Sequence, residues 1–148
     1  DVLKISIAND HAGLNLKNII LNFLNKKNFS IIDLGVNNDK SVDYPDYAYS
    51  MAQIFKNESI NFGILICGTG IGISIAANRF KHIRAALCHD VDTTKLARQH
   101  NNANIIVFGG RIINPDLALR CVETFINTEY EGGRHDKRIN KLDNPTIF

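Results

Sequence analysis

Five short runs rich in β-branched residues alternate with helical patterns, and this alternation limits the possible folds more than any other feature of the chain. The runs cover residues 4–8, 30–34, 62–67, 84–88 and 104–108. Strands separated by helices pair in parallel through right-handed crossovers. At 148 residues, the chain is long enough to bury such a sheet beneath helices. The sequence therefore predicts a single α/β domain over residues 1–148, with a five-stranded parallel sheet.

The segments between these runs carry helix signals. The first has an apolar stripe at helical spacing, formed by Leu16, Ile19, Ile20, Phe23 and Leu24. Its other positions are expected to face water, namely Lys17, Asn18, Lys26 and Lys27. A third helix is expected over residues 74–80. The start signals of the other helices are Pro45, Asp92 with Thr93, and Asn114 with Pro115.

Charge and hydropathy narrow the class of partner. The formal net charge is only +2, so we expect no general field for nucleic acid or membrane surfaces. No apolar stretch approaches the ~20 residues of a membrane span, and no signal peptide precedes the first expected strand. These features predict a cytoplasmic protein in which any phosphate recognition is local.

The three cysteines predict free thiols rather than a disulfide framework. Cys67, Cys88 and Cys121 are an odd number, and each lies in or beside a regular segment. No two Cys or His residues have the spacing of a zinc finger, and neighbours such as Cys88 and His89 would point to opposite faces of a strand. We therefore expect no structural metal.

A glycine-rich turn follows Cys67 and leads into a helix. Gly68, Gly70 and Gly72 let the chain turn sharply, so several backbone N–H groups can converge on an anion. The same field would favour a thiolate at Cys67. The spacing does not fit a dinucleotide fingerprint, which needs a third glycine or alanine where Ile73 or Ile75 stands. It does not fit a Walker loop either, because that loop needs a lysine after its last glycine, where Ile73 stands. The turn therefore predicts a ligand smaller than a dinucleotide, with a purely structural turn as the alternative.

Polar and glycine-rich residues follow every expected strand. In an open parallel sheet, ligands collect outside the carboxyl ends of the strands. The residues at these positions are 9–13, Gly35, 67–70, His89 with Asp90, and 109–111. A further basic cluster near the chain end includes Arg134 and Arg138, which share a helix face and can clamp a phosphate. A solvated charged face is the alternative for this cluster.

Four motifs in this order resemble the B-type ribose-5-phosphate isomerases. They are Asp10-His11, residues 67–74, residues 98–101 and residues 130–135. The resemblance covers nearly the whole chain. It implies a Rossmann-like three-layer sandwich with helices on both faces of the sheet. It also implies a homodimer or dimer of dimers with shared active sites and no metal or organic cofactor. The C-terminal helical segment, about residues 134–148, would then lie at the subunit interface.

The resemblance also implies a role for each matching residue. Cys67 would be the base that moves a proton between sugar carbons, and His100 would open the sugar ring. Thr69 would add a hydroxyl at the enediolate, and Asp10 would hold the ring oxygen or hydroxyls. The remaining substrate-binding residues would be His11, Tyr44, Gly68, Gly70, Ile71, Gly72, Ser74, Asn101, Arg111, Arg134 and Arg138, with His135 as a further phosphate ligand.

Other functions remain open from the sequence. The substrate could be a six-carbon aldose phosphate, allose 6-phosphate or galactose 6-phosphate. Some relatives of the family carry a glutamate base where Ile73 stands, which leaves that role to Cys67 here. A noncatalytic sugar-phosphate sensor would keep the arginines but would not need both Cys67 and His100. A cysteine phosphatase would need an arginine at position 73.

Overall fold

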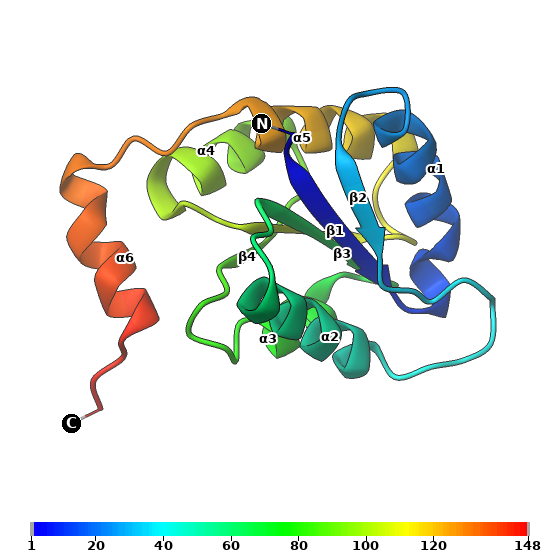
Figure 1. Ribbon diagram of the computed structural model, residues 1–148, viewed down its shortest axis with the longest axis horizontal. Coiled ribbons are helices and arrows are strands. Elements are labelled where there is room, and N and C mark those ends of the chain that lie inside the picture. Colours follow the sequence, from blue (N-terminus) through cyan, green and yellow to red (C-terminus); the bar gives the residue numbers. More distant parts are fainter. Residues whose placement is uncertain (1, 148) are drawn as a thin grey trace.

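The computed structural model describes residues 2–147, and its strands form one parallel sheet (Figure 1). The strands are β1 (Lys4–Asn9), β2 (Ser30–Asp33), β3 (Phe62–Cys67), β4 (Ala85–Leu87) and β5 (Ile105–Gly109). Their order across the sheet is β2-β1-β3-β5-β4, and every neighbouring pair is parallel. All five expected strands are confirmed, with ends that shift by one residue at most.

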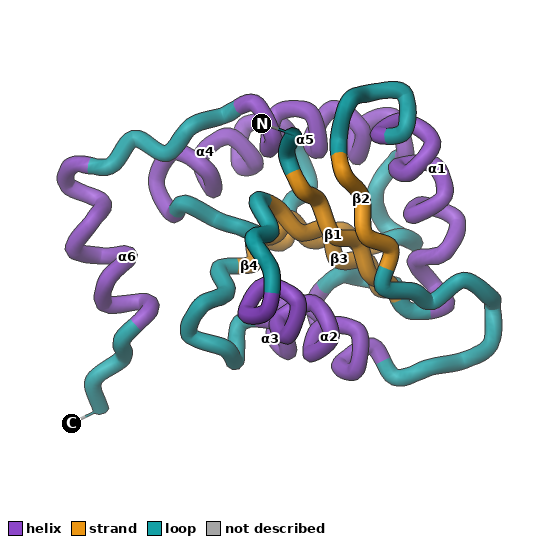
Figure 2. Tube along the Cα trace, in the orientation of Figure 1, coloured by secondary structure: helices purple, strands orange, loops and turns teal. Residues whose placement is uncertain are grey.

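Helices cover both faces of the sheet, as expected for a three-layer sandwich (Figure 2). One face carries α1 (Leu14–Leu24), α4 (Val91–Asn101) and α5 (Pro115–Asn127). The other carries α2 (Tyr44–Asn57) and α3 (Ile71–Ala77). Each helix layer buries its own apolar cluster against the sheet. One cluster is centred on Ile66, Phe108 and Phe125, and the other on Met51 and Leu65. The sheet is therefore shielded from water, which suits its nearly continuous apolar strands.

The strand order reverses between β1 and β3. The chain moves from β1 outward to β2, and then returns to place β3 on the other side of β1. Loops that leave the carboxyl ends of two such strands turn to opposite faces of the sheet, which opens a crevice between them. Asp10 and Cys67 lie at this switch point, because Asp10 directly follows β1 and Cys67 is the last residue of β3.

The helix start signals were partly right. Pro45 lies in the first turn of α2, and the Asn114 side chain caps α5 by accepting a hydrogen bond from the Asp116 N–H. The expected cap at Asp92 is wrong, because the Asp90 side chain accepts from the Thr93 N–H at 2.7 Å. The helix expected over 74–80 instead runs from Ile71 to Ala77. It starts earlier because Gly70, at φ +80°, turns the chain directly into it.

Lys17 is the clearest departure from the expected pattern. Asn18, Lys26 and Lys27 face water as expected, but Lys17 is fully buried. Its Nζ donates to the Val36 carbonyl at 2.6 Å and to Asn37 Oδ1 at 2.6 Å, and pairs with Asp33 Oδ1 at 3.2 Å. The last residue of β2 and the loop after it supply all three acceptors. The helical pattern of residues 14–24 contains no information about that loop, so the expectation failed here.

The C-terminal segment leaves the body of the molecule. It comprises the short helix η2 (Gly133–His135) and α6 (Asp136–Asp143), and α6 stands apart from the sheet layers in Figure 1. Arg84 Nη1 holds its far end by contacting Asp143 Oδ1 at 3.0 Å. The helical part is shorter than the expected 134–148, and Phe148 lies outside the described residues. Within residues 2–147, no helix has both the length and the apolar character needed to cross a membrane.

Candidate active site

Cys67 and Asp10 lie side by side at the switch point of the sheet. Cys67 is the last residue of β3 and is 4% exposed. Asp10 follows β1 directly, and its N–H donates to the Ile66 carbonyl at 3.1 Å. The two residues are therefore positioned by the backbone of adjacent strands, rather than by a flexible loop. This arrangement brings a thiol and a carboxylate together at the carboxyl ends of β1 and β3.

The glycine-rich turn folds back on the thiol. The Gly70 N–H donates to Cys67 Sγ at 3.2 Å, and the Ile71 N–H donates to Thr69 Oγ1 at 3.2 Å. A side chain at Gly70 would collide with Leu87 and with the Phe108 backbone. The turn therefore needs glycine at this position both because φ is positive and because there is no room for a side chain. Ser74 Oγ donates to the Ile71 carbonyl at 2.7 Å and so closes the first turn of α3.

Several amides of this turn remain available to a ligand. Among the described residues, the N–H groups of Thr69, Gly72 and Ile73 donate to no protein acceptor. The Thr69 side chain is exposed at the same place. Preorganised donors of this kind stabilise an oxyanion without reorganising during a reaction. The turn can therefore serve an anion that forms close to the Cys67 sulfur.

Arg111 and Tyr44 border the turn on two sides. A methyl group at Gly68 would lie 3.3 Å from Arg111 Nη1, which places the guanidinium against that glycine. A methyl group at Gly72 would likewise lie 2.7 Å from the Tyr44 hydroxyl. Both side chains belong to exposed residues. The predicted residues Gly68, Gly72, Tyr44 and Arg111 are thus brought together around the glycine-rich turn.

Asp10 also organises the loop that follows β1. Its Oδ1 accepts from the N–H groups of Ala12 at 3.0 Å and Gly13 at 3.2 Å, which caps the short helix η1 (His11–Gly13). His11 Nδ1 accepts from the Val42 N–H at 3.2 Å, so in the neutral ring the proton lies on Nε2. That nitrogen can donate to a ligand.

Sequence reasoning placed Asn9 among the residues after the first strand but gave it no role. It is fully buried, and its Nδ2 donates to the Asp10 carbonyl at 2.9 Å and the Val36 carbonyl at 3.1 Å. It therefore ties the loop after β2 to the loop that carries Asp10. Its Oδ1 has no protein partner among the described residues. The available signal was its position as a polar residue at the carboxyl end of a strand.

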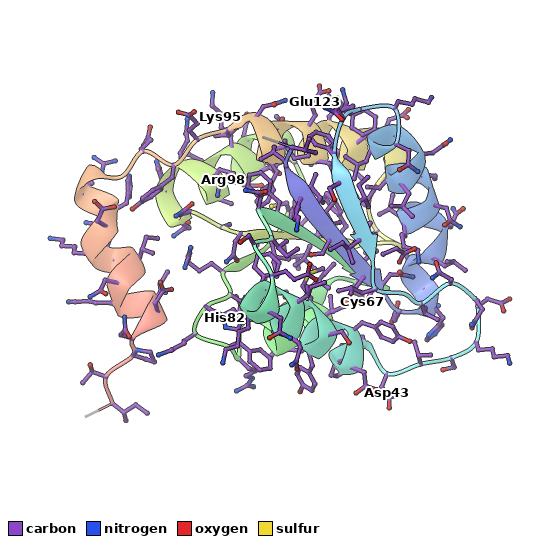
Figure 3. All side chains as sticks on the ribbon, viewed as in Figure 1. Asp43, Cys67, His82, Lys95, Arg98 and Glu123 are labelled. Atoms are coloured by element: carbon purple, nitrogen blue, oxygen red, sulfur yellow. The ribbon has the colours of Figure 1, made fainter. Side chains whose placement is uncertain are left out.

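The remaining predicted residues gather at the opposite, amino ends of the strands. His100 and Asn101 end α4, close to where β5 begins. Cys67 pairs with Gly109 at the other end of β5, and the four residue steps from Ile105 to Gly109 span about 13 Å at the usual strand rise. Figure 3 shows the same separation, with Cys67 and Arg98 of α4 at opposite ends of the sheet. One chain therefore does not bring His100 to Cys67.

His100 belongs to a second cluster. Its ring stacks on His135, with centroids 4.4 Å apart and planes inclined by 18°. Glu131 Oε1 lies 3.7 Å from the Nε2 atom of each ring. Burial and the nearby His100 and Arg134 lower the pKa of His135, which keeps its imidazole neutral near pH 7, while Glu131 acts in the opposite direction.

Arg98 anchors this second cluster and was given no role by sequence reasoning. Its guanidinium is buried over the rings of Phe62 and Phe125. It donates to the carbonyls of Ala103 at 2.6 Å and Thr128 at 3.1 Å, which joins the end of α4 to the segment after α5. A residue of this kind looks like any helical arginine in sequence, because its partners lie in distant segments.

Arg134 and Arg138 extend the second cluster into solvent. Both are exposed, and they lie close enough to His135 to lower its pKa. Neither forms an ion pair within residues 2–147. Unpaired guanidinium groups suit phosphate oxygens, because their planar fork can contact two of them. The basic cluster is thus available to an anion, but far from Cys67 of the same chain.

Comparison with known proteins identifies the class. The model of the Ribose/Galactose Isomerase family matches residues 5–142. A putative sugar phosphate isomerase of Rickettsia conorii is 46% identical over 138 residues, which cover 93% of this chain and 96% of that protein. Ribose-5-phosphate isomerase B of Escherichia coli is 41% identical over 139 residues, which cover 94% and 93%.

Solved structures agree with these relatives. The chain is similar to a ribose 5-phosphate isomerase of Thermotoga maritima, with a TM-score of 0.93 and 51% identity, over 95% of this chain and 97% of that one. It is also similar to ribose-5-phosphate isomerase B of Mycoplasma genitalium, solved with bound ribulose-5-phosphate, with a TM-score of 0.89 and 44% identity over 95% and 94%.

The fold and the family match together define an isomerase built on a parallel α/β sandwich. The chain belongs to the ribose/galactose isomerase family.

Proposed function

We propose that the protein interconverts D-ribose 5-phosphate and D-ribulose 5-phosphate. The observation that carries the proposal is the thiol of Cys67 at the switch point of the sheet, beneath a turn with free amides. The relatives named for this reaction match nearly the full chain. One of them is described with the ketose product bound.

The proposed proton transfer uses Cys67 as the base. Its thiolate takes the proton from C2 of the open aldose, and the electrons move toward the C1 carbonyl to give an enediolate. The same proton returns to C1, while the hydroxyl proton passes from O2 to O1. The free amides of the turn and the Thr69 hydroxyl stabilise the enediolate oxygen, a contribution worth about 3 kcal/mol per donor.

We infer that each active site is shared by two chains. Ring opening needs a group that can both donate and accept a proton, for which the proposed group is the imidazole of His100. Its distance from Cys67 in one chain requires that a second copy supply it. The exposed Arg134 and Arg138 would bind the phosphate from the same copy, with Arg111 and His11 beside Cys67. A homodimer, or a dimer of dimers, satisfies this requirement.

A coupled assay with ribose 5-phosphate tests the activity. Cys67→Ala is expected to lower kcat by about 10³-fold, within the range of general-base catalysis. Cys88→Ala is the matched control, because Cys88 is equally small and buried but lies away from the turn. Turnover of Cys67→Ala near that of Cys88→Ala would contradict the mechanism. Allose 6-phosphate and galactose 6-phosphate, assayed in parallel, test substrate choice; faster turnover of either would overturn the pentose assignment.

A further inference from the structure

Three potential metal ligands meet outside the Cys67 turn. They are His100 at the end of α4, His135 in η2, and Glu131 between α5 and η2. One donor atom from each residue lies within 4.8 Å of the other two. We propose that this cluster binds a divalent transition-metal ion of the Zn²⁺ type.

The spacing of the donor atoms is close to that of a metal site. Both imidazole Nε2 atoms lie 3.7 Å from Glu131 Oε1, too far for hydrogen bonds. In a tetrahedral zinc site with bonds of about 2.0 Å, neighbouring ligand atoms are roughly 3.3 Å apart. Each of these edges must therefore contract by only about 0.4 Å. Two imidazoles and one carboxylate also form a ligand set that zinc accepts, with water in the fourth position.

The backbone holds two of the three ligands near each other. The Glu131 N–H donates to the Gln99 carbonyl at 3.0 Å, which fixes the residue beside His100. His135 is buried, so its ring has little freedom to leave the cluster.

Two features limit the affinity of the site. The stacked rings have nearly parallel planes, so one imidazole must rotate before both lone pairs meet at one ion. The His100 side chain is 37% exposed and can make this movement. The charges of Arg134 and Arg138 also oppose a cation next to His135. We therefore expect binding weaker than that of a buried structural zinc site.

The ion would inhibit the enzyme rather than assist it. Coordination occupies the Nε2 lone pair of His100, which the proposed ring opening uses to transfer a proton. This consequence rests on the proposed function, whereas binding of the ion does not. Removal of the ion by EDTA should restore the activity of a zinc-treated sample.

Binding is measured first, by calorimetry with Zn²⁺ and by the visible absorption of Co²⁺, on the full chain. Glu131→Gln and His135→Asn should each weaken binding by more than about tenfold, since even outer-shell changes reach that loss. Glu129→Gln is the matched control, because Glu129 is an exposed carboxylate two positions away. Cys67→Ala should bind like the wild type, which separates the cluster from the thiol.

Inhibition by Zn²⁺ is then measured for wild type, Glu131→Gln and Glu129→Gln. The concentration for half inhibition should rise by more than about tenfold only in Glu131→Gln. Unchanged binding in both Glu131→Gln and His135→Asn would overturn the metal site. If binding weakens as expected but the bound ion does not inhibit, the metal site stands and the ring-opening role of His100 is wrong.

Discussion

The candidate functional residues are held differently at the two ends of the strands. At the carboxyl ends of the strands, Cys67 and Asp10 end or directly follow two adjacent strands. The turn above them packs against β4 and β5. At the opposite, amino ends, His100 ends a helix, while Arg134 and Arg138 lie on a segment that leaves the body. The first group is built into the sheet, whereas the second faces outward. The proposed sharing of each site between two chains rests on this difference: one chain would supply Cys67 for proton transfer, and a second chain would supply His100.

Hybrid dimers test this division most strongly. Cys67→Ala and His100→Asn homodimers should each lose at least about 10²-fold in activity. A purified hybrid with one chain of each kind should recover about half of the wild-type activity, because one of its two sites then keeps both groups. The measurement is a coupled isomerase assay on differentially tagged, co-expressed chains.

The reciprocal hybrid provides the control. A chain with both substitutions, paired with a wild-type chain, places one lesion in each shared site and should be nearly inactive. If each site instead lies within one chain, the results reverse: the double-mutant hybrid is half active and the first hybrid is inactive. The two hybrids carry the same substitutions, so differences in folding cannot produce this reversal.

Thiol labelling compares Cys67 with the cysteines beneath the other face of the sheet. Burial raises the pKa of Cys88 to about 11 and also raises that of Cys121. At pH 8, only about 0.1% of Cys88 is therefore a thiolate, and its alkylation rate should rise about tenfold per pH unit up to that pKa. Iodoacetamide followed by mass spectrometry should modify Cys67 first. Equal labelling of Cys88 at pH 8 would contradict this order.

Lys17→Met tests whether the loop after β2 depends on the buried Lys17 cation. The substitution leaves the Val36 carbonyl and Asn37 Oδ1 without their donor, while Asp33 keeps some contact with water. We expect a loss of about 3 kcal/mol in the free energy of unfolding, measured with urea. Lys26→Met, in the exposed turn that follows α1, should change the free energy of unfolding by less than about 0.5 kcal/mol. Similar values for both variants would mean that the Lys17 contacts contribute nothing net.

Asp143→Asn should have the smallest effect on stability, because it acts on the C-terminal segment that stands apart from the sheet. It weakens the partly exposed ion pair with Arg84, which is worth less than about 1 kcal/mol. Amide exchange should therefore become faster in α6 and remain unchanged in the strands. Asp92→Asn serves as a control, since Asp92 forms no ion pair within residues 2–147. Faster exchange in β3 would show that the segment is coupled to the sheet.

Features encoded locally were predictable from the sequence. The strand that ends at Cys67 follows from a short apolar run before glycines, and the start of α5 follows from Asn114 and Pro115. Lys17, Asn9 and Arg98 could not be assigned in this way, because loops distant in sequence supply their partners. The split of the candidate site follows from strand direction: His100 ends a helix that runs back toward the start of β5.

The contact between Gly70 and Leu87 has a consequence for how this enzyme can evolve. Gly70 donates to the Cys67 sulfur, and the position of its Cα leaves no space for a methyl group beside Leu87 on the edge strand β4. A change of shape at Leu87 would therefore move the donor at the thiol without touching any polar group. Selection on turnover should then constrain an apolar side chain in an outer strand. We therefore expect substitutions at Leu87 to affect turnover as well as stability.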